Sequence, residues 1–254
     1  MKLFRFLSSQ IAYAVHSRAF SLSEVTGANK GIGHGIVEGL IKCLTPQSEW
    51  HVYLTARNVP LGNEAVEDFV KQGLPVKFHQ LDITDRESRD KFADYIKSNY
   101  PDGINILVNN AGIAYSNDLT VPFGELARDT ITTNYFATVD MCNTFLPLMA
   151  QNSRLVNVSS MLSVTTLKQL SDELYEKFVN PMTIEQLNDL MYDFIKKAEA
   201  GDLVGWPLTA YGVSKLGLTK ATFILAEQFK DDPRRILINA VSIAPQKLLK
   251  CLPM

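Results

Sequence analysis

The sequence has little of what would indicate an extracellular, metal-binding or membrane-spanning protein. Its three cysteines, Cys43, Cys142 and Cys251, are far apart and form no CxxC or metal-ligand spacing. An odd number of scattered thiols favours reduced intracellular cysteines over a disulfide framework. No apolar run reaches the roughly 18 residues that a membrane span needs. These absences predict a soluble protein without a metal site and without a membrane partner.

An excess of charge of one sign is also missing. The 254 residues include 25 Lys and Arg against 27 Asp and Glu, a formal net charge of −2, and the basic residues form no large cluster. A nucleic-acid partner is therefore not expected. With 46% hydrophobic residues, the chain is long enough to bury the core of one large α/β domain.

Acidic residues are absent before Glu24, whereas Lys2, Arg5 and Arg18 are present. A basic, acid-poor and serine-containing start is typical of a mitochondrial transit peptide, and the alternative is an untargeted extension or an alternative first exon. The default expectation is a cytoplasmic protein. We predict an extension over residues 1–23, a single dinucleotide-binding domain over 24–241 and a divergent tail over 242–254.

Short apolar runs alternate with amphipathic stretches along the domain. The predicted strands are Ser21–Val25, His51–Thr55, Val76–His79, Ile104–Asn109, Leu155–Val158 and Ile236–Ala240. The stretches predicted to be helical are Gly31–Leu44, Glu64–Gln72, Arg86–Asn99 and Phe123–Met149. This alternation predicts a Rossmann-like, doubly wound parallel sheet in the α/β class, with ligands bound beyond the carboxyl ends of its strands.

A glycine-rich loop stands between the first predicted strand and the first helix. Its spacing is GxxxGxG, and its candidate cofactor residues are Gly27, Asn29, Lys30, Gly31, Ile32 and Gly33. Glycines let a backbone turn tightly and approach a pyrophosphate, which then rests on the amides of a helix N-terminus. Taken alone, the pattern also fits a surface turn.

The residue after the second predicted strand indicates which dinucleotide is bound. Arg57 stands where an NAD-selective site has a carboxylate, and an arginine suits the 2′-phosphate of NADP. Arg57 and Lys30 together would surround that phosphate, although each also fits a solvated surface charge. The paired placement favours NADPH and NADP⁺ as the cofactor.

Two later loops fit the same cofactor. Asp82 and Ile83 follow the third strand, where an acid can accept from the adenine amino group, although Asp82 also suits a helix cap. Small residues after the fourth strand allow close backbone contact with the cofactor, and the candidates there are Asn110, Ala111 and Gly112.

Tyr211 and Lys215 form a YxxxK pair in a helical stretch, with the i,i+4 spacing that places both side chains on one face. An adjacent ammonium favours phenolate, which would let Tyr211 exchange protons near neutral pH. Ser160 ends the fifth strand, where its hydroxyl can bond a substrate carbonyl. Without these neighbours, YxxxK would be an ordinary amphipathic helix face.

The ordered motifs TGANKGIG, LDI, NNAG, Asn134, NVSS and YGVSK resemble the short-chain dehydrogenase/reductase superfamily. A helical insertion before YxxxK, about residues 168–200, is similar to that of the monomeric NADPH-dependent carbonyl reductases. The resemblance implies that Tyr211 donates the proton and that Lys215 lowers its pKa and binds the nicotinamide ribose. It also implies that Ser160 orients the carbonyl and that Asn134 holds a water. The insertion would cover the surface through which other members associate, so a monomer is expected.

Both ends depart from the family pattern. Ser23 and Glu24 are poor choices for a buried central strand, since an unpaired carboxylate there must be protonated or pay a large desolvation penalty. Past Ala240 the family's Pro-Gly motif does not follow, so its last strand and one wall of the substrate site are expected to be missing, as in a splice form or a gene-model fragment.

The main reading is an enzyme that reduces ketones, aldehydes or quinones with NADPH. The alternatives are a catalytically impaired NADP-binding or interaction protein and a steroid or prostaglandin dehydrogenase of the same superfamily. A serine hydrolase is disfavoured because no GxSxG elbow is present.

Overall fold

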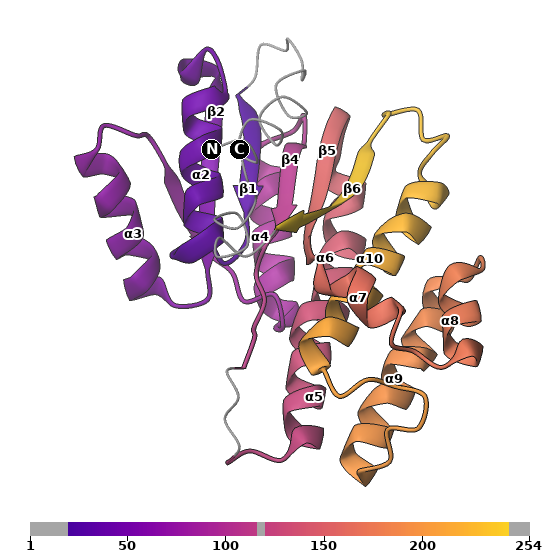
Figure 1. Cartoon of the computed structure of the whole chain (residues 1–254). Helices are drawn as coiled ribbons and strands as arrows, with labels where there is room; N and C mark the ends of the chain where they lie inside the picture. Colours follow the sequence, from indigo (N-terminus) through magenta and orange to yellow (C-terminus); the bar gives the residue numbers. More distant parts are fainter. Residues whose placement is uncertain (1–19, 116–119, 244–254) are drawn as a thin grey trace, which may run out of the picture.

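The computed structural model of the protein describes residues 20–115 and 120–243. Within them the chain forms one parallel sheet of six strands in the order β3-β2-β1-β4-β5-β6 (Figure 1). The strands are β1 (Ser21–Val25), β2 (Trp50–Ala56), β3 (Lys77–Gln80), β4 (Ile104–Asn109), β5 (Met149–Ser160) and β6 (Leu237–Ile243). The strand order reverses between β1 and β4, which is where doubly wound sheets bind ligands. The predicted fold class is confirmed.

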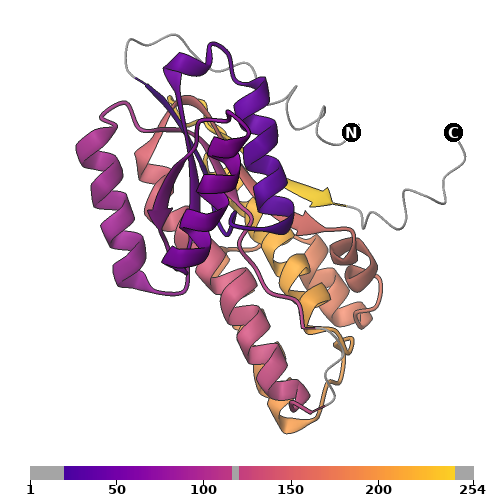
Figure 2. The same cartoon turned by 90° about the vertical axis from the view of Figure 1, so that its left-hand side faces the viewer.

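Helices follow most strands and cover both faces of the sheet (Figures 1 and 2). They are α2 (Gly31–Cys43), α3 (Val59–Lys71), α4 (Arg86–Asn99), α5 (Phe123–Ile131), α6 (Ala137–Phe145), α7 (Leu162–Leu167), α8 (Asp172–Val179), α9 (Ile184–Ala200) and α10 (Ala210–Gln228). Short helical turns occur at η1 (Gln47–Glu49), η2 (Thr132–Phe136) and η3 (Leu146–Leu148). No helix in the described ranges has the length and apolarity to cross a bilayer.

The sheet separates two apolar cores because neighbouring side chains along a strand point to opposite faces. On one face α2 and α3 pack through residues such as Val37 and Phe69 onto Val25 of β1. On the other face α4 and α6 pack on Leu22 and Leu107. Burial on both faces explains why the strands read as continuous apolar runs.

Helix α3 begins earlier than its apolar pattern predicted. The Asn58 side chain accepts a hydrogen bond from the Leu61 amide at 3.0 Å and caps the helix, with a proline in its first turn. The cap sets the start at Val59, five residues before the predicted Glu64.

The predicted helix Phe123–Met149 is broken into several parts, so that expectation is corrected. Helix α5 passes through a π-helical segment, η2, into α6, and then η3 leads into β5, which starts at Met149. A π turn inserts a residue into the helical repeat and rotates the side chains after it. Asn134 lies within this segment.

The unusual β1 residues lie in the sheet as the strand prediction requires. Ser23 and Glu24 are fully buried, and Glu24 is in register with Tyr53 of β2 and Leu107 of β4. Its Oε1 accepts a hydrogen bond from the Thr55 hydroxyl at 2.8 Å, while Oε2 and the Ser23 hydroxyl have no partner. Burial raises the pKa of Glu24 to about 8, with the Thr55 bond acting in the opposite direction. The carboxyl is therefore largely protonated at neutral pH.

The predicted insertion forms α8 and α9, which lie beside α5 and α10 (Figure 1). Leu187, Met191 and Phe194 of α9 are completely buried in a third core with α5 and α10. The cap of α9 is a capping box between Thr183 and Gln186. The insertion therefore covers these two helices with the chain's own residues.

The expected terminal segments are described only in part. Ser21–Ser23, which fell within the predicted extension, form the start of β1, and residues 242–243 end β6. Residues 1–19 of the predicted extension and the predicted tail from residue 244 lie outside the described residues. Among the described residues, β6 is the last strand.

Candidate active site

A cleft of about 430 Å³ opens at the carboxyl ends of the strands, where the strand order reverses. Predicted residues that line it are Gly27, Asn29, Lys30, Gly31, Ile32, Arg57, Asp82, Ile83, Asn110, Ala111, Gly112, Tyr211 and Lys215. Lining residues that the sequence analysis did not single out include Leu81, Thr84, Ile113, Ala114, Thr133, Val158 and Ser159. The predicted Gly33, Asn134 and Ser160 lie around the cleft without lining it.

The glycines of the first loop have three different tasks. Gly27 has a φ of +60°, and a Cβ there would lie 2.9 Å from the Cα of Ala111. Gly31 also has a φ of +60°, but a Cβ there would meet only open space. A Cβ on Gly33 would lie 2.4 Å from Nδ2 of Asn110, so this glycine serves packing. Of these three glycines, Gly31 is therefore the one with open space beside its Cα.

The N-terminus of α2 fits a bound phosphate. Lys30 is the N-cap residue, and its side chain makes no capping hydrogen bond. The first turn also contains no acidic residue. Free amides at a helix N-terminus form an anion site, and the arrangement at Gly31 therefore fits a pyrophosphate.

Thr26 joins the two loops that meet in the cleft, a role that the sequence did not reveal. Its hydroxyl accepts hydrogen bonds from the amides of Asn110 at 2.9 Å and Ala111 at 2.8 Å. The Asn110 amide group donates to the Thr26 carbonyl at 2.9 Å. Asn110 therefore holds the glycine loop with its side chain.

The loops after β2 and β3 supply Arg57, Asp82 and Ile83 to the lining of the cleft. Arg57 and Lys30 both line the cleft there. Asp82 does not cap α4, because Asp85 does so by accepting from the Glu87 amide at 3.0 Å. Instead, Oδ1 of Asp82 accepts from the amide and the hydroxyl of Thr84, which closes a tight local turn. The capping alternative for Asp82 is therefore wrong.

Both the oxygen and the nitrogen of the Asn134 side-chain amide form hydrogen bonds. Its Oδ1 accepts from the Ile113 amide at 2.7 Å, and its Nδ2 donates to the Ile113 carbonyl at 2.8 Å and to the Ser214 hydroxyl at 3.1 Å. The residue is completely buried. It connects the π segment η2 with the loop after β4 and with α10, which carries Tyr211 and Lys215.

The two serines at the end of β5 have different environments. The Ser159 hydroxyl is buried and bonded to α10, at 3.2 Å from the Lys215 carbonyl oxygen and 2.6 Å from the Thr219 hydroxyl. The Ser160 hydroxyl accepts from the Leu162 amide at 3.2 Å and lies close enough to the Tyr211 phenol to lower its pKa. Ser160 is thus the serine that meets the tyrosine.

Tyr211 and Lys215 come together on the first turns of α10. Burial raises the pKa of the Tyr211 phenol, and the hydrogen bond with Ser160 lowers it. Burial also lowers the pKa of Lys215 to about 8, and its ammonium donates to the Val158 carbonyl at 2.8 Å. The lowering of the Tyr211 pKa by Lys215, expected from the motif, is not among these effects and stays a prediction.

Apolar side chains are exposed next to these polar groups. Met161 and Leu162 directly follow Ser160, and Leu208 precedes Tyr211 by three residues; all three are exposed. No cluster of His, Cys, Asp and Glu suited to a metal ion occurs in the part of the chain that the structure describes. Apolar residues that do line the cleft beside Tyr211 include Ile113, Ala114 and Val158.

These observations agree with the comparisons with known proteins. The short chain dehydrogenase family matches residues 24–172, and the chain belongs to this family. It is 41% identical over 228 residues to carbonyl reductase (NADPH) 3 of Homo sapiens, covering 88% of this chain and 80% of that protein. It is 44% identical over 223 residues to carbonyl reductase (NADPH) 1 of Bos taurus, covering 85% and 78%.

Solved structures show the same fold. Salutaridine reductase from Papaver somniferum superposes with a TM-score of 0.76 at 28% identity, covering 87% of this chain and 85% of that one. Menthone neomenthol reductase from Mentha piperita has a TM-score of 0.76 at 29% identity, covering 88% and 89%.

Proposed function

We propose that this chain reduces the carbonyl group of ketones, aldehydes and quinones to an alcohol, with NADPH as the reductant. The observation that carries the proposal is that Tyr211 and Lys215 line the same cleft from one helix, with the Lys215 ammonium 5.7 Å from the centre of the Tyr211 ring. The names of the carbonyl reductases that this chain resembles support the same reaction and the same cofactor.

The protein groups suited to hold NADPH lie around the cleft. The α2 N-terminus and Gly31 would accommodate the pyrophosphate, and Arg57 with Lys30 would surround the 2′-phosphate. Asp82 and Ile83 would hold the adenine, and Lys215 would hold the nicotinamide ribose. When bound, NADPH supplies the hydride that the carbonyl carbon receives.

Tyr211 gives its proton to the carbonyl oxygen. Reduction needs a protonated phenol, and Tyr211 meets this need because burial raises its pKa further above the ordinary value of 10. Ser160 donates a hydrogen bond to the same oxygen and stabilises the negative charge that develops on it. Lys215 and Asn134 link the phenol to solvent, from which the proton is replaced.

The substrate is an apolar carbonyl compound. Ile113, Ala114 and Val158 line the cleft together with Tyr211, and this apolar lining favours aromatic or aliphatic bodies over charged ones. A steroid or prostaglandin would also fit this chemistry, so the substrate series should include a representative of each.

The direct test combines turnover with binding. Oxidation of NADPH is followed with menadione as substrate, and NADPH binding is followed by its fluorescence in the same preparation. We expect both. Binding without turnover would instead support the alternative of a catalytically impaired NADP-binding protein, and the absence of both would refute the proposal.

We also propose a cytoplasmic monomer. The support for a monomer is the insertion, because α8 and α9 bury the faces of α5 and α10 that would otherwise be available for association. Fractionation of cells would test the compartment, including the mitochondrial alternative.

A further inference from the structure

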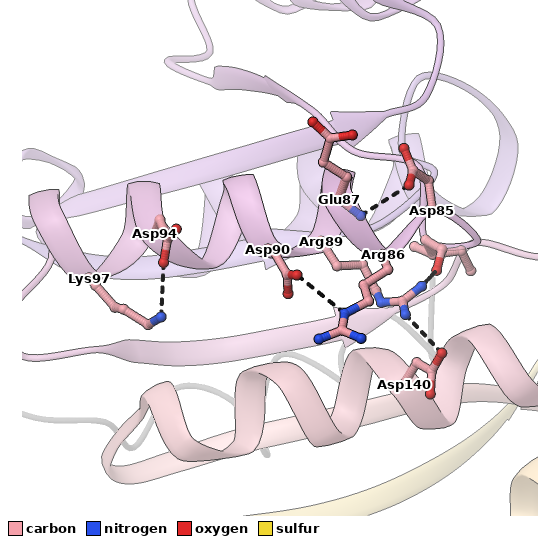
Figure 3. A network of polar contacts seen from close by, with 9 residues as sticks. Asp85, Arg86, Glu87, Arg89, Asp90, Asp94, Lys97 and Asp140 are labelled. Carbon is pink, nitrogen blue, oxygen red and sulfur yellow. Dashed lines mark hydrogen bonds and ion pairs between the residues drawn. The ribbon is translucent and has the colours of Figure 1, made fainter.

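Arg89 lies in the first turn of α4, three residues after the helix begins, and its charged side chain is buried. Its side chain is only 8% exposed and reaches away from the solvent side of the helix (Figure 3). One nitrogen, Nη1, donates to the Ile83 carbonyl at 2.6 Å, and the other, Nη2, donates to the Asp140 carboxylate at 2.8 Å. Arg89 therefore joins α4, the loop after β3 and α6.

The same helix holds the other side of this loop. The Asp82 amide donates to the Ser88 hydroxyl at 2.9 Å, and that hydroxyl donates to the Gln80 side chain at 3.1 Å. Ser88 and Arg89 are neighbours on α4, so the two bonds fix the backbone on both sides of the Asp82 side chain. Asp82 and Ile83 both line the cleft.

Helix packing alone does not explain this arginine. Burying a guanidinium costs several kcal/mol of desolvation in general, and an apolar side chain of similar size packs two helices at lower cost. The Arg89 Nε has no partner, so part of that penalty is not offset. What the guanidinium adds over an apolar residue is directional bonding, and one of its two bonds is to the backbone of a cleft-lining residue.

We propose that Arg89 is a positioning residue for the adenine end of the dinucleotide site. It holds the Ile83 carbonyl from α4, with Asp140 of α6 fixing the guanidinium, and thereby sets where Asp82 and Ile83 meet the adenine. This inference rests on the proposed function, because it takes the loop after β3 to be the adenine side of an NADPH site.

The test replaces Arg89→Met, which keeps the length of the apolar stem and removes both hydrogen bonds. Binding is measured for NADPH and for adenosine 2′,5′-bisphosphate, a probe that carries the adenine and the 2′-phosphate without the nicotinamide. We expect both dissociation constants and the KM for NADPH to rise about tenfold, as for the loss of one charge-assisted hydrogen bond. The kcat at saturating NADPH and the KM for menadione should stay unchanged.

Arg86→Met is the matched control. Arg86 lies one turn earlier on the exposed side of α4, with an ion pair to Asp90 at 3.5 Å (Figure 3). The same substitution there should change no constant. If Arg89→Met does not fold, Arg89→Lys and Asp140→Asn take its place, with smaller losses in the same two affinities.

The outcomes separate the two proposals. Unchanged affinity for both probes in a folded Arg89 variant overturns the positioning role. The positioning role is also overturned if kcat and the melting temperature both fall while the KM for menadione rises. That result would indicate a purely structural residue. A parent protein that binds neither probe refutes the proposed function itself, and the positioning role with it.

Discussion

The Lys215 ammonium lies 5.7 Å from the centre of the Tyr211 ring, on the same face of α10. The i,i+4 spacing of the two residues in a regular helix produces this arrangement. Because the pKa of Lys215 is lowered to about 8 by burial, the group is a cation at neutral pH and loses its charge as the pH rises through about 8. The pair is therefore cationic in the pH range where the reaction is proposed.

Tyr211→Phe should abolish most turnover while leaving NADPH bound, because the lost hydroxyl faces the substrate. The loss of a general acid lowers kcat by about 10²–10⁴-fold. Turnover with menadione and NADPH fluorescence measure the two effects. Tyr192→Phe, at an exposed position of α9, is the control and should be silent. Equal kcat in parent and Tyr211→Phe would contradict the proposed proton donor.

Ser160→Ala should lower catalytic turnover, whereas Ser159→Ala should mainly lower the stability of the fold. Removing the Ser160 hydroxyl takes away the proposed donor to the substrate carbonyl and a group that lowers the pKa of Tyr211, so kcat should fall with little change in NADPH affinity. Removing the Ser159 hydroxyl breaks bonds to α10 and should instead lower the free energy of unfolding by about 1 kcal/mol. Steady-state kinetics and chemical denaturation of each variant decide this, and a larger kcat loss in Ser159→Ala would reverse the assignment.

Arg57→Asp should change the cofactor preference. The substitution removes a cation from the proposed 2′-phosphate and introduces a repulsive carboxylate, while the ribose hydroxyl of NADH gains an acceptor. One charge-assisted contact is worth about 1.5–3 kcal/mol, so NADPH affinity should fall at least about tenfold relative to NADH. Arg86→Asp, outside the cleft, provides the control for net charge. Unchanged relative affinities would remove Arg57 from the site.

Glu24→Gln should reduce the change in the free energy of unfolding between about pH 4.5 and pH 8. The carboxyl has a pKa of about 8 in the folded protein and an ordinary value of 4.5, so the folded state binds more protons between these limits. Stability from this group is therefore complete below about pH 4.5, falls as the pH rises to about 8 and then levels off. The difference at pH 7 is on the order of 3 kcal/mol.

The measurement is denaturant unfolding of the parent and of Glu24→Gln from pH 5 to 9. The free energy of unfolding of the variant should increase relative to that of the parent as the pH rises. Ser23→Ala is the control, because it replaces a buried, unpartnered hydroxyl that does not titrate in this range. Parallel curves for parent and Glu24→Gln would show that Glu24 is not buried in the folded protein.

Light scattering should show a monomer whose apparent mass does not change with concentration. Met191→Glu introduces a charge on the buried face of α9, where its sulfur packs closely on Gly217 of α10, and should cause association. Tyr192→Glu, on the exposed side of the same helix, should stay monomeric. A stable tetramer of the parent would contradict the covering role of the insertion.

The sequence predicted the elements whose signal is local. The runs before Thr26 and Asn110 and the run that ends at Ser160 were identified as strands, and the motifs at their ends meet in one cleft. The fold requires this, since parallel strands bring their carboxyl ends to one edge. Even β1, with two polar residues in its centre, was located by the glycine loop that follows it.

Features set by distant contacts were not predictable. The π segment η2 depends on packing of Tyr135 and Asn134 against residues more than twenty positions away. Thr26 and Arg89 bond to backbone amides and a backbone carbonyl. Every residue type carries these groups, so the sequence does not indicate which of them will be the partner. The start of β5 at Met149 follows from pairing with Ile104, while its own first residues are mostly polar.

The hydroxyl of Thr26 bonds two amides that lie 84 and 85 residues further along the chain. These bonds form only once β1 has taken its place beside β4, so no fragment that ends before Asn110 contains both sides of this contact. Contacts of such long sequence separation form after local helices during folding. The joining of the two cleft loops by Thr26 therefore depends on the pairing of β1 with β4 at the centre of the sheet.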